Sequence, residues 1–398
     1  MMKLTARINS IKPSPTLAIT MKADALRAEG RDIIGFGAGE PDFDTPDNVK
    51  KAAIRAIEEG FTKYTPVGGI DALKDAIIGK LERDNELSYS RAQIVVSCGA
   101  KHTLYNLAQV LFEEGDEVIV PSPYWVSYPD IIILTGAKPV ILKTNASEGF
   151  KIQPSQLEAA INERTRAVII NSPSNPSGVA YTKAEMEKLA DVLMKKRIMA
   201  ISDDIYEKIL YNGLSFTNIA SVNPGMKDLA IVVNGLSKSH AMTGWRIGYA
   251  AGPADVIAAI TKLQSQNTSN PNSIAQKASV EALNGDQTAA NSMVREFEKR
   301  RNVIVERLNA IEGINCMNPQ GAFYVFPNIA GLLGRKHGGK ALSTSADLAT
   351  YLLDEANVAV IPGGEFGHDD HIRLSYATSM LNIEKGMARI RSAVAKLA

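Results

Sequence analysis

Apolar residues follow two different periods along the chain. They recur at helical spacing from Asp47 to about Gly60 and from about Ile70 to Leu87. Further along, short apolar runs with strand character alternate with helix-like segments such as Thr103–Glu113 and Lys183–Lys195. The expected strands are Ile94–Ser97, Glu117–Val120, Lys138–Leu142, Ala167–Asn171, Ile198–Ser202, Ala230–Asn234 and Ile247–Ala251. This alternation predicts a three-layer α/β/α domain with a mostly parallel sheet.

The last third of the chain has a different pattern. It becomes helical around Pro271–Asn284, and Ala289–Ile311 has the apolar spacing of one long amphipathic helix. Short strand-like runs and two further helices are then expected at Ala322–Phe326, Ser345–Glu355, Val358–Ile361, His371–Ser375 and Asn382–Lys396. Together they predict a second, smaller α+β domain.

Turn signals interrupt the N-terminal stretch up to about Thr45. They are Pro13, Pro15 and the run from Gly37 to Pro46, so this stretch is expected to wrap onto the rest of the chain rather than fold alone. We therefore predict an arm and segment over residues 1–46 that pack with the small domain, a large domain over 47–285 and a small domain over 286–398.

Composition narrows the class of protein. The 44 Lys and Arg residues nearly balance the 43 Asp and Glu residues, and no basic block stands out, which argues against a nucleic-acid partner. No apolar run approaches the roughly 20 residues of a membrane span. Cys98 and Cys316 are too few and too far apart for a disulfide framework, and the first residues lack a signal-peptide pattern. A cytoplasmic protein is expected.

Polar residues follow four of the predicted strands, at the ends where open α/β sheets bind ligands. The first strand is followed by the small-residue turn Cys98–Lys101 and a helix, whose N-terminus favours a phosphate. The other three strand ends are followed by Asn175, by Asp203 with Tyr206, and by Lys238. Taken singly, these are an ordinary turn, a helix cap and a solvated lysine. Together they suit a phosphorylated pyridine aldehyde, but the pattern alone leaves both interpretations open.

A long motif favours one of them. Gly235–Pro253 (GLSKSHAMTGWRIGYAAGP) resembles the Schiff-base segment of the class I aminotransferases, which are fold-type I pyridoxal phosphate enzymes. Further segments of this family follow in order along nearly the whole chain: Gly37–Pro46, Lys63–Gly69, Pro123–Pro129, Asn171–Gly178, Ser202–Tyr206, Gly321–Val325 and Ile372–Ala377. The similarity is greatest to bacterial aspartate aminotransferases, in a branch where some members also use prephenate.

The resemblance implies a role for each matching residue. Lys238 would hold pyridoxal 5'-phosphate as a Schiff base and, once released, move a proton as general base. The implied cofactor contacts are Asp203 at the ring nitrogen, Tyr206 and Asn175 at the phenolic oxygen, Trp125 beside the ring, and Arg246 with Gly99, Ala100 and Lys101 at the phosphate. Tyr64 would reach the phosphate of a second subunit, which implies a homodimer. The implied substrate contacts are Arg373 at the α-carboxylate, with Gly39, Trp125 and Asn175 beside it.

Two positions complicate the transfer of roles. Many relatives carry Ser or Thr three residues before the lysine as a phosphate ligand, whereas this chain has Gly235, and Ser237 is a candidate replacement. Lys12 matches a position linked to prephenate use in this branch; its alternative is a solvated residue of the arm. His368 and His371, near Asp369 and Asp370, are interpreted as a solvated turn, and no metal is assigned.

The expected activity is ping-pong transamination between L-aspartate and 2-oxoglutarate, with prephenate as a further amino acceptor. The remaining alternatives are an alanine or aromatic aminotransferase, a fold-type I lyase, and a non-catalytic regulator of the same fold. The regulator would need an N-terminal DNA-binding module, and the arm before Gly37 is short for one.

Overall fold

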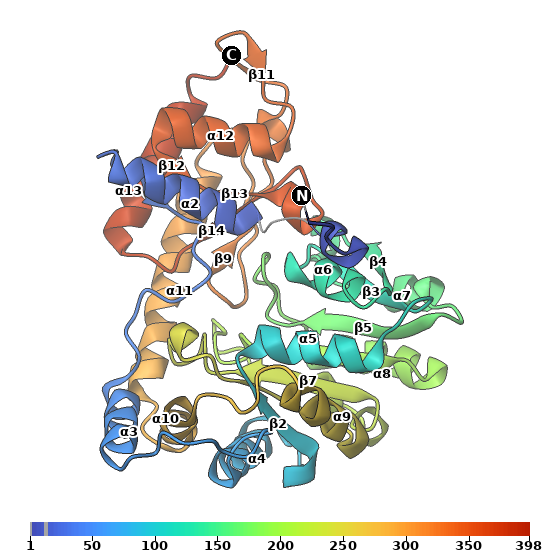
Figure 1. The fold of residues 1–398 in the computed structure, drawn as a ribbon. Coiled ribbons are helices and arrows are strands. Elements are labelled where there is room, and N and C mark those ends of the chain that lie inside the picture. The colour runs from blue at the N-terminus through green and yellow to red at the C-terminus, as the bar shows by residue number, and fades with distance from the viewer. Residues whose placement is uncertain (1, 12–14) are drawn as a thin grey trace.

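A seven-stranded sheet forms the centre of the computed structural model, which describes residues 2–11 and 15–398 (Figure 1). Its strand order is β2-β8-β7-β6-β5-β3-β4. The strands are β2 (Ile94–Ser97), β3 (Glu117–Ser122), β4 (Lys138–Lys143), β5 (Thr165–Asn171), β6 (Met199–Asp203), β7 (Ala230–Gly235) and β8 (Gly248–Ala251). Only β8 runs antiparallel to its neighbours in this sheet, which agrees with the predicted mostly parallel arrangement.

Helices cover both faces of this sheet. One face carries α3 (Asp47–Glu58), α4 (Asp71–Asn85), α7 (Pro154–Ala160), α8 (Lys183–Lys196) and α10 (Ser273–Asn284); the other carries α5 (Ala100–Leu111), α6 (Ser127–Ile133) and α9 (Ala254–Ser265). Successive strand residues point to opposite faces, so Val95 and Val96 belong to separate apolar cores. The three-layer fold is confirmed.

A further apolar core lies beside this three-layer domain and is built largely from the last third of the chain. It is called the second core below, and the three-layer domain is called the first. Its helices are α11 (Thr288–Asn309), α12 (Ser345–Ala356) and α13 (Met380–Val394). Its strands are β9 (Tyr324–Val325), β10 (Lys336–His337), β11 (Lys340–Ala341), β12 (Val358–Ala359), β13 (Ile361–Pro362) and β14 (Ile372–Ser375). The single strand predicted at Val358–Ile361 is in fact two, because β12 pairs with β1 (Ile34–Gly35) whereas β13 pairs with β14.

The N-terminal region contains a helix that was not predicted. Besides the single turn α1 (Ala6–Asn9), α2 spans Pro15–Ala28. Pro15 was interpreted as a turn signal, but it is the first residue of the helix, where its missing N–H is not needed. Ala23 of α2 and Ile33 beyond it pack with Leu353 of α12 and Ala359 of β12.

The chain between the two cores is short. α10 ends at Asn284 and α11 begins at Thr288, close to the expected boundary at 285/286, although the three-part division stays a prediction. Single-turn helices are found at Arg91–Gln93, Ala146–Glu148, Ile219–Ser221, Pro224–Met226, Thr243–Trp245, Ala330–Leu332 and Gly363–Phe366. Among the described residues, none of the helices has the length and apolar character needed to cross a membrane.

Candidate active site

A cavity of about 470 Å³ lies where the carboxyl ends of β5, β6 and β7 face the second core. The structure brings most of the predicted site residues to its wall: Gly39, Ala100, Lys101, Trp125, Asn175, Asp203, Tyr206, Ser237, Lys238, Arg246 and Arg373. Parallel strands end at one edge of the sheet, so residues from distant parts of the chain meet there.

Lys238 is half-buried in this cavity, three residues after the end of β7. Its Nζ donates a hydrogen bond to the carbonyl oxygen of Gly39 at 2.5 Å. Burial lowers the pKa of the Lys238 amine to about 8, and the neighbouring charge of Glu40 partly opposes this shift. A substantial share of the amine is therefore neutral near physiological pH, the form needed for a nucleophile or a base.

Asp203 is the last residue of β6 and is buried. Burial raises the pKa of its carboxyl to about 6, while the hydrogen bonds from Tyr128 and from the Ile205 backbone act in the opposite direction. The Tyr128 hydroxyl donates to Oδ2 at 2.5 Å and the Ile205 N–H donates to Oδ1 at 3.3 Å. This carboxylate would be stabilised by a cationic donor placed in the cavity.

The start of α5 forms one corner of the site. Gly99 caps the helix with φ of 95°, a conformation that suits glycine, and no side chain caps the helix N-terminus. The Arg246 guanidinium lies where a Gly99 side chain would be, and donates to the carbonyls of Thr243 at 2.8 Å and Cys98 at 3.3 Å. A guanidinium beside a helix N-terminus is suited to a phosphate.

Gly235 has a structural explanation. A Cβ at this position would lie 2.8 Å from the carbonyl oxygen of Ile247, directly before the neighbouring strand β8, and 3.2 Å from Cα of Gly248 in that strand. Gly235 also lines a different cavity from the one that contains Lys238. A hydroxyl side chain does not fit here without a shift of β8, whereas Ser237 does border the site.

Arg373 is buried on β14 and belongs to the second core's sheet. It donates to Asn175 Oδ1 at 3.0 Å and to the Gly37 carbonyl at 2.9 Å, and it packs over the Tyr324 ring. Its Nε has no hydrogen-bond partner in the described part of the chain. Arg373 is therefore fixed in place and retains a donor for an incoming carboxylate.

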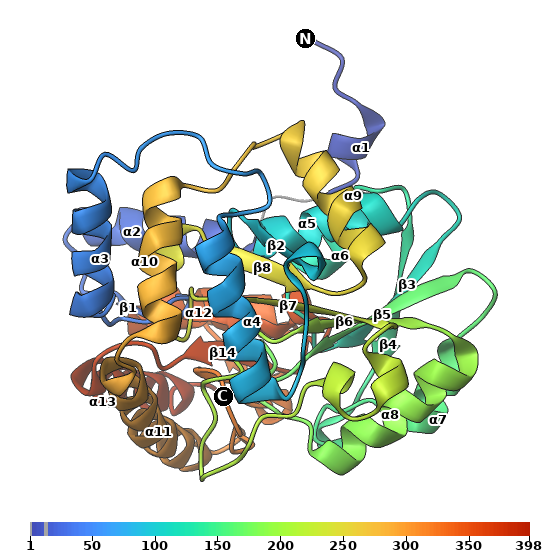
Figure 2. The ribbon, with the colours of Figure 1, turned by 90° about the horizontal axis from the view of Figure 1, so that it is seen from below.

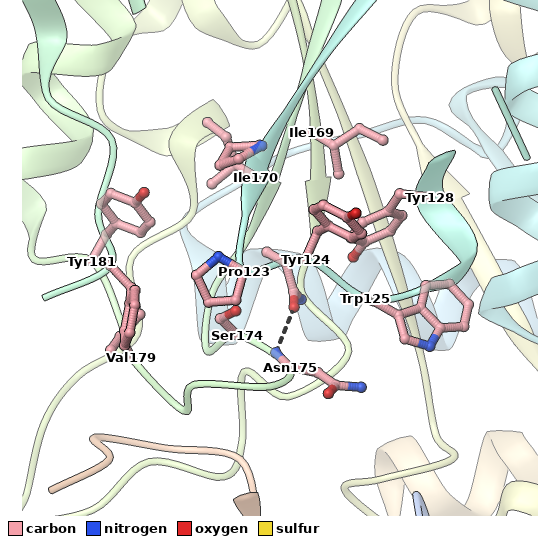
Figure 3. Close-up of a pocket in the computed structure, with 13 residues that line it drawn as sticks. Pro123, Tyr124, Trp125, Tyr128, Ile169, Ile170, Ser174, Asn175, Val179 and Tyr181 are labelled. Atoms are coloured by element: carbon pink, nitrogen blue, oxygen red, sulfur yellow. Dashed lines mark hydrogen bonds between the residues drawn. The ribbon is translucent and has the colours of Figure 1, made fainter. Parts of the chain in front are cut away.

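Asn175 is held from the sheet side. Its backbone N–H donates to Asn171 Oδ1 at 2.9 Å (Figure 3), and Asn171 Nδ2 donates to the carbonyl of Asp203 at 2.8 Å. A small cavity of about 30 Å³, whose lining includes Tyr124, Trp125 and Asn175, lies next to these contacts. The ends of β5 and β6 are thus linked by side-chain bonds as well as by the sheet.

Among the cavity residues that were not predicted, three have side chains that bond other residues of the site. Tyr128 bonds Asp203, the Tyr324 hydroxyl lies 2.9 Å from that of Tyr206, and Glu40 accepts a bond from Thr243 at 2.7 Å. All three belong to segments noted in the sequence for their family pattern, but only the packing indicates what their side chains contact.

Two predicted site residues do not line the cavity: Tyr64, which is 89% exposed, and Gly99, which adjoins it as the cap of α5. Lys12 lies outside the described residues. Ligand-type atoms of His368, Asp370 and His371 lie within 4.8 Å of one another. His371 Nδ1 is 2.8 Å from Asp370 Oδ1, so these two side chains pair with each other. The assignment of no metal stays a prediction.

This fold, with a lysine, a buried carboxylate and two arginines converging at the strand ends, matches a known class of protein. The chain belongs to the family described as aminotransferase class I and II, which matches residues 31–390. The family resemblance inferred from the sequence is thereby confirmed.

Relatives that match over nearly their whole length are also named as aminotransferases. The chain is 50% identical to the aspartate/prephenate aminotransferase of Nitrosomonas europaea over 98% of this chain and 99% of that protein. It is 51% identical to the aspartate aminotransferase of Geobacillus stearothermophilus, over 98% of each. The solved aspartate aminotransferase from Rhizobium meliloti superposes with a TM-score of 0.97 at 46% identity, covering 100% of both chains.

Proposed function

We propose that this protein is a pyridoxal phosphate-dependent aspartate aminotransferase, which converts L-aspartate and 2-oxoglutarate to oxaloacetate and L-glutamate. The observation that carries the proposal is the convergence of Lys238, Asp203 and Arg373 on one cavity, in a chain about half identical to relatives of that name. We also propose a cytoplasmic location, from the composition.

The cavity's donors and acceptors fit the cofactor. Asp203 is a buried carboxylate that would face a protonated ring nitrogen, and Arg246 with the start of α5 would hold the phosphate. Tyr206 and Asn175 would bond the phenolic oxygen, and the Trp125 indole would flank the ring. Lys238 would provide the amine for the covalent link.

When bound, pyridoxal phosphate supplies an electron sink for the carbanion that forms at the substrate α-carbon. The chain's own residues do the rest. Arg373 binds the α-carboxylate and orients the substrate, while the Asp203 carboxylate would stabilise the protonated ring nitrogen. The freed Lys238 amine, with its lowered pKa, would accept the proton of the α-carbon and pass it on to the cofactor carbon to which Lys238 had been linked. Because donor and acceptor use one site in turn, ping-pong kinetics follow.

The names of the relatives favour aspartate over other amino donors. The similar structure from Thermus thermophilus, with a TM-score of 0.92 at 41% identity, was determined with the dicarboxylate maleate. We propose prephenate as a second amino acceptor, because several relatives are named aspartate/prephenate aminotransferases and Lys12 matches a position linked to that use.

A panel of substrates tests this function. Steady-state rates with aspartate, glutamate, alanine and aromatic donors would be measured against 2-oxoglutarate, oxaloacetate and prephenate. We expect kcat/KM for aspartate to exceed that for alanine by about 100-fold, because alanine leaves the group that binds the distal carboxylate unpaired. Preference for alanine or an aromatic donor, with negligible aspartate turnover, would contradict the assignment.

The same assay separates a transaminase from a lyase. With aspartate alone, a transaminase releases one equivalent of oxo acid per site and then stops, whereas a lyase continues to turn over.

We further propose a homodimer in which Tyr64 of one chain completes the phosphate site of the other. Tyr64→Phe is expected to weaken cofactor binding by about 10-fold, the loss of one charge-assisted hydrogen bond. The decisive measurement uses hybrid dimers of a Tyr64→Phe chain and a Lys238→Ala chain. If Tyr64 acts across the interface, one site per hybrid has both native residues and binds cofactor with wild-type affinity. If neither site of the hybrid binds cofactor with wild-type affinity, Tyr64 acts within its own chain.

A further inference from the structure

On the face of the sheet away from Asp203, a buried ion pair links α4 to the turn that follows β6. Lys80 of α4 forms an ion pair with Glu207, and both side chains are more than nine-tenths buried. Asn85 completes the group, because its Oδ1 accepts from Lys80 at 2.7 Å and its Nδ2 donates to Glu207 at 3.0 Å. All three polar side chains are satisfied by one another.

This group is attached to the site through a single turn of chain. Asp203 and Asp204 point to opposite faces because strand residues alternate. Glu207 follows on the face of Asp204, and its N–H donates to the Asp204 carbonyl at 2.9 Å. Asp204 is itself bonded by Ser202 at 2.7 Å and by Asn218. The turn that presents Asp203 and Tyr206 to the cavity is therefore fixed from behind.

A second cavity reaches the same place. It has a volume of about 390 Å³, and Lys80 and Glu207 line it together with Gly235, Leu236 and Ser239. These last three residues belong to the segment that carries Lys238. Figure 2 shows α4 and α10 side by side over this face of the sheet. The buried pair thus borders the reverse side of both segments that supply the main site residues.

The energetic balance of a buried ion pair indicates a role other than stabilising the fold. Burying two charges costs desolvation that their attraction only roughly offsets, so well-packed apolar residues often replace such a pair without loss of stability. Removing one partner is costly, since the other is left buried and uncompensated. A pair of this kind is well suited to specifying one geometry of the turn.

We propose that Lys80 and Glu207 are positioning residues that set the geometry of the Asp203–Tyr206 turn for catalysis. The inference rests on the proposed function, because the geometry matters only if Asp203 and Tyr206 hold the cofactor. Neither Lys80 nor Glu207 lines the cavity that contains Lys238, so their effect on the reaction is exerted through the turn.

Three variants of the holoenzyme test it: Lys80→Met, Glu207→Gln and the double variant Lys80→Met/Glu207→Leu. Lys80→Met leaves Glu207 unpaired and is expected to lower the unfolding temperature by roughly 5–10 °C. The double variant removes both charges and is expected to recover most of that loss. The matched control is Lys208→Met on the same cavity, whose ammonium pairs with Asp84 at 2.8 Å from a 45% exposed side chain.

The deciding readout is the double variant at a temperature where it is folded. We expect kcat to remain at least about 10-fold below wild type, because a small displacement of the site is costly, while KM for aspartate is unchanged. Arg373 forms its hydrogen bonds with Asn175 and the Gly37 carbonyl and none with this turn, so we expect substrate binding to be retained. The visible circular dichroism of the bound cofactor should change in the double variant and stay native in Lys208→Met.

A double variant with wild-type kcat and a native cofactor spectrum would overturn the inference and leave the pair a purely structural one. A wild-type protein that neither binds pyridoxal phosphate nor transaminates aspartate would instead refute the proposed function, so the two failures are distinguishable.

Discussion

Replacing Lys238 by alanine is expected to lower kcat/KM for aspartate by at least about 10³-fold. The substitution removes both the amine that holds the cofactor and the base that moves the α-carbon proton, and a positioned general base alone contributes roughly 10²–10⁴-fold. The measurement is steady-state transamination at saturating cofactor. Mass spectrometry after borohydride reduction checks the covalent link, which we expect on Lys238 in the wild type and nowhere in the variant.

A surface lysine provides the control for this experiment. Lys195→Ala removes an ammonium on a solvated face of α8, which pairs with Glu158 at 2.9 Å and does not line the cavity, and its activity should be native. Normal turnover in Lys238→Ala, or a reduced adduct at another lysine, would contradict the role assigned to Lys238.

Asp203→Asn is expected to lower kcat by about 10²–10³-fold while making the cofactor-free protein more stable at pH 7. An amide cannot compensate a protonated ring nitrogen, and loss of one partner of a buried charge pair costs about 3–5 kcal/mol. The measurements are steady-state kinetics and thermal unfolding of the cofactor-free chain.

The gain in stability depends on pH. Burial raises the pKa of the Asp203 carboxyl from 3.8 to about 6, so the folded state binds a proton that the unfolded state releases between these values. Wild-type stability therefore falls as pH rises from about 4 to 6, by up to about 3 kcal/mol for this group. The stability advantage of Asp203→Asn should be present at pH 7 and absent at pH 4. An equal advantage at both pH values would contradict the raised pKa.

Tyr128→Phe is the matched control for that experiment. It deletes one donor to Asp203 and leaves the carboxylate, so it should raise the pKa of Asp203 further and cause a smaller loss of kcat than Asp203→Asn.

Much of the fold could be predicted because its signals are local. Each predicted strand of the central sheet lies within two residues of the observed one, and β2 coincides with the prediction at Ile94–Ser97. Buried strands are short apolar runs, and both their length and their apolar spacing can be recognised from consecutive residues. The helix α2 was missed because Pro15 has two local meanings, a turn or a helix start, and the residues packed against α2 decide between them.

The candidate site divides in the same way. The sequence by itself placed Lys238 and Asp203 after predicted strands, and its resemblance to the class I aminotransferases implied their chemistry and that of Arg246. Tertiary structure decided which side chains touch. Arg373 bonds Asn175 from 198 residues away, and Tyr128 bonds Asp203 across two elements. Gly235 is explained only by the approach of β8, and the Lys80–Glu207 pair only by the packing of α4 behind the sheet. The physical reason is that local periodicity fixes the direction of each side chain within its element, whereas contacts between distant elements depend on how their buried surfaces fit together.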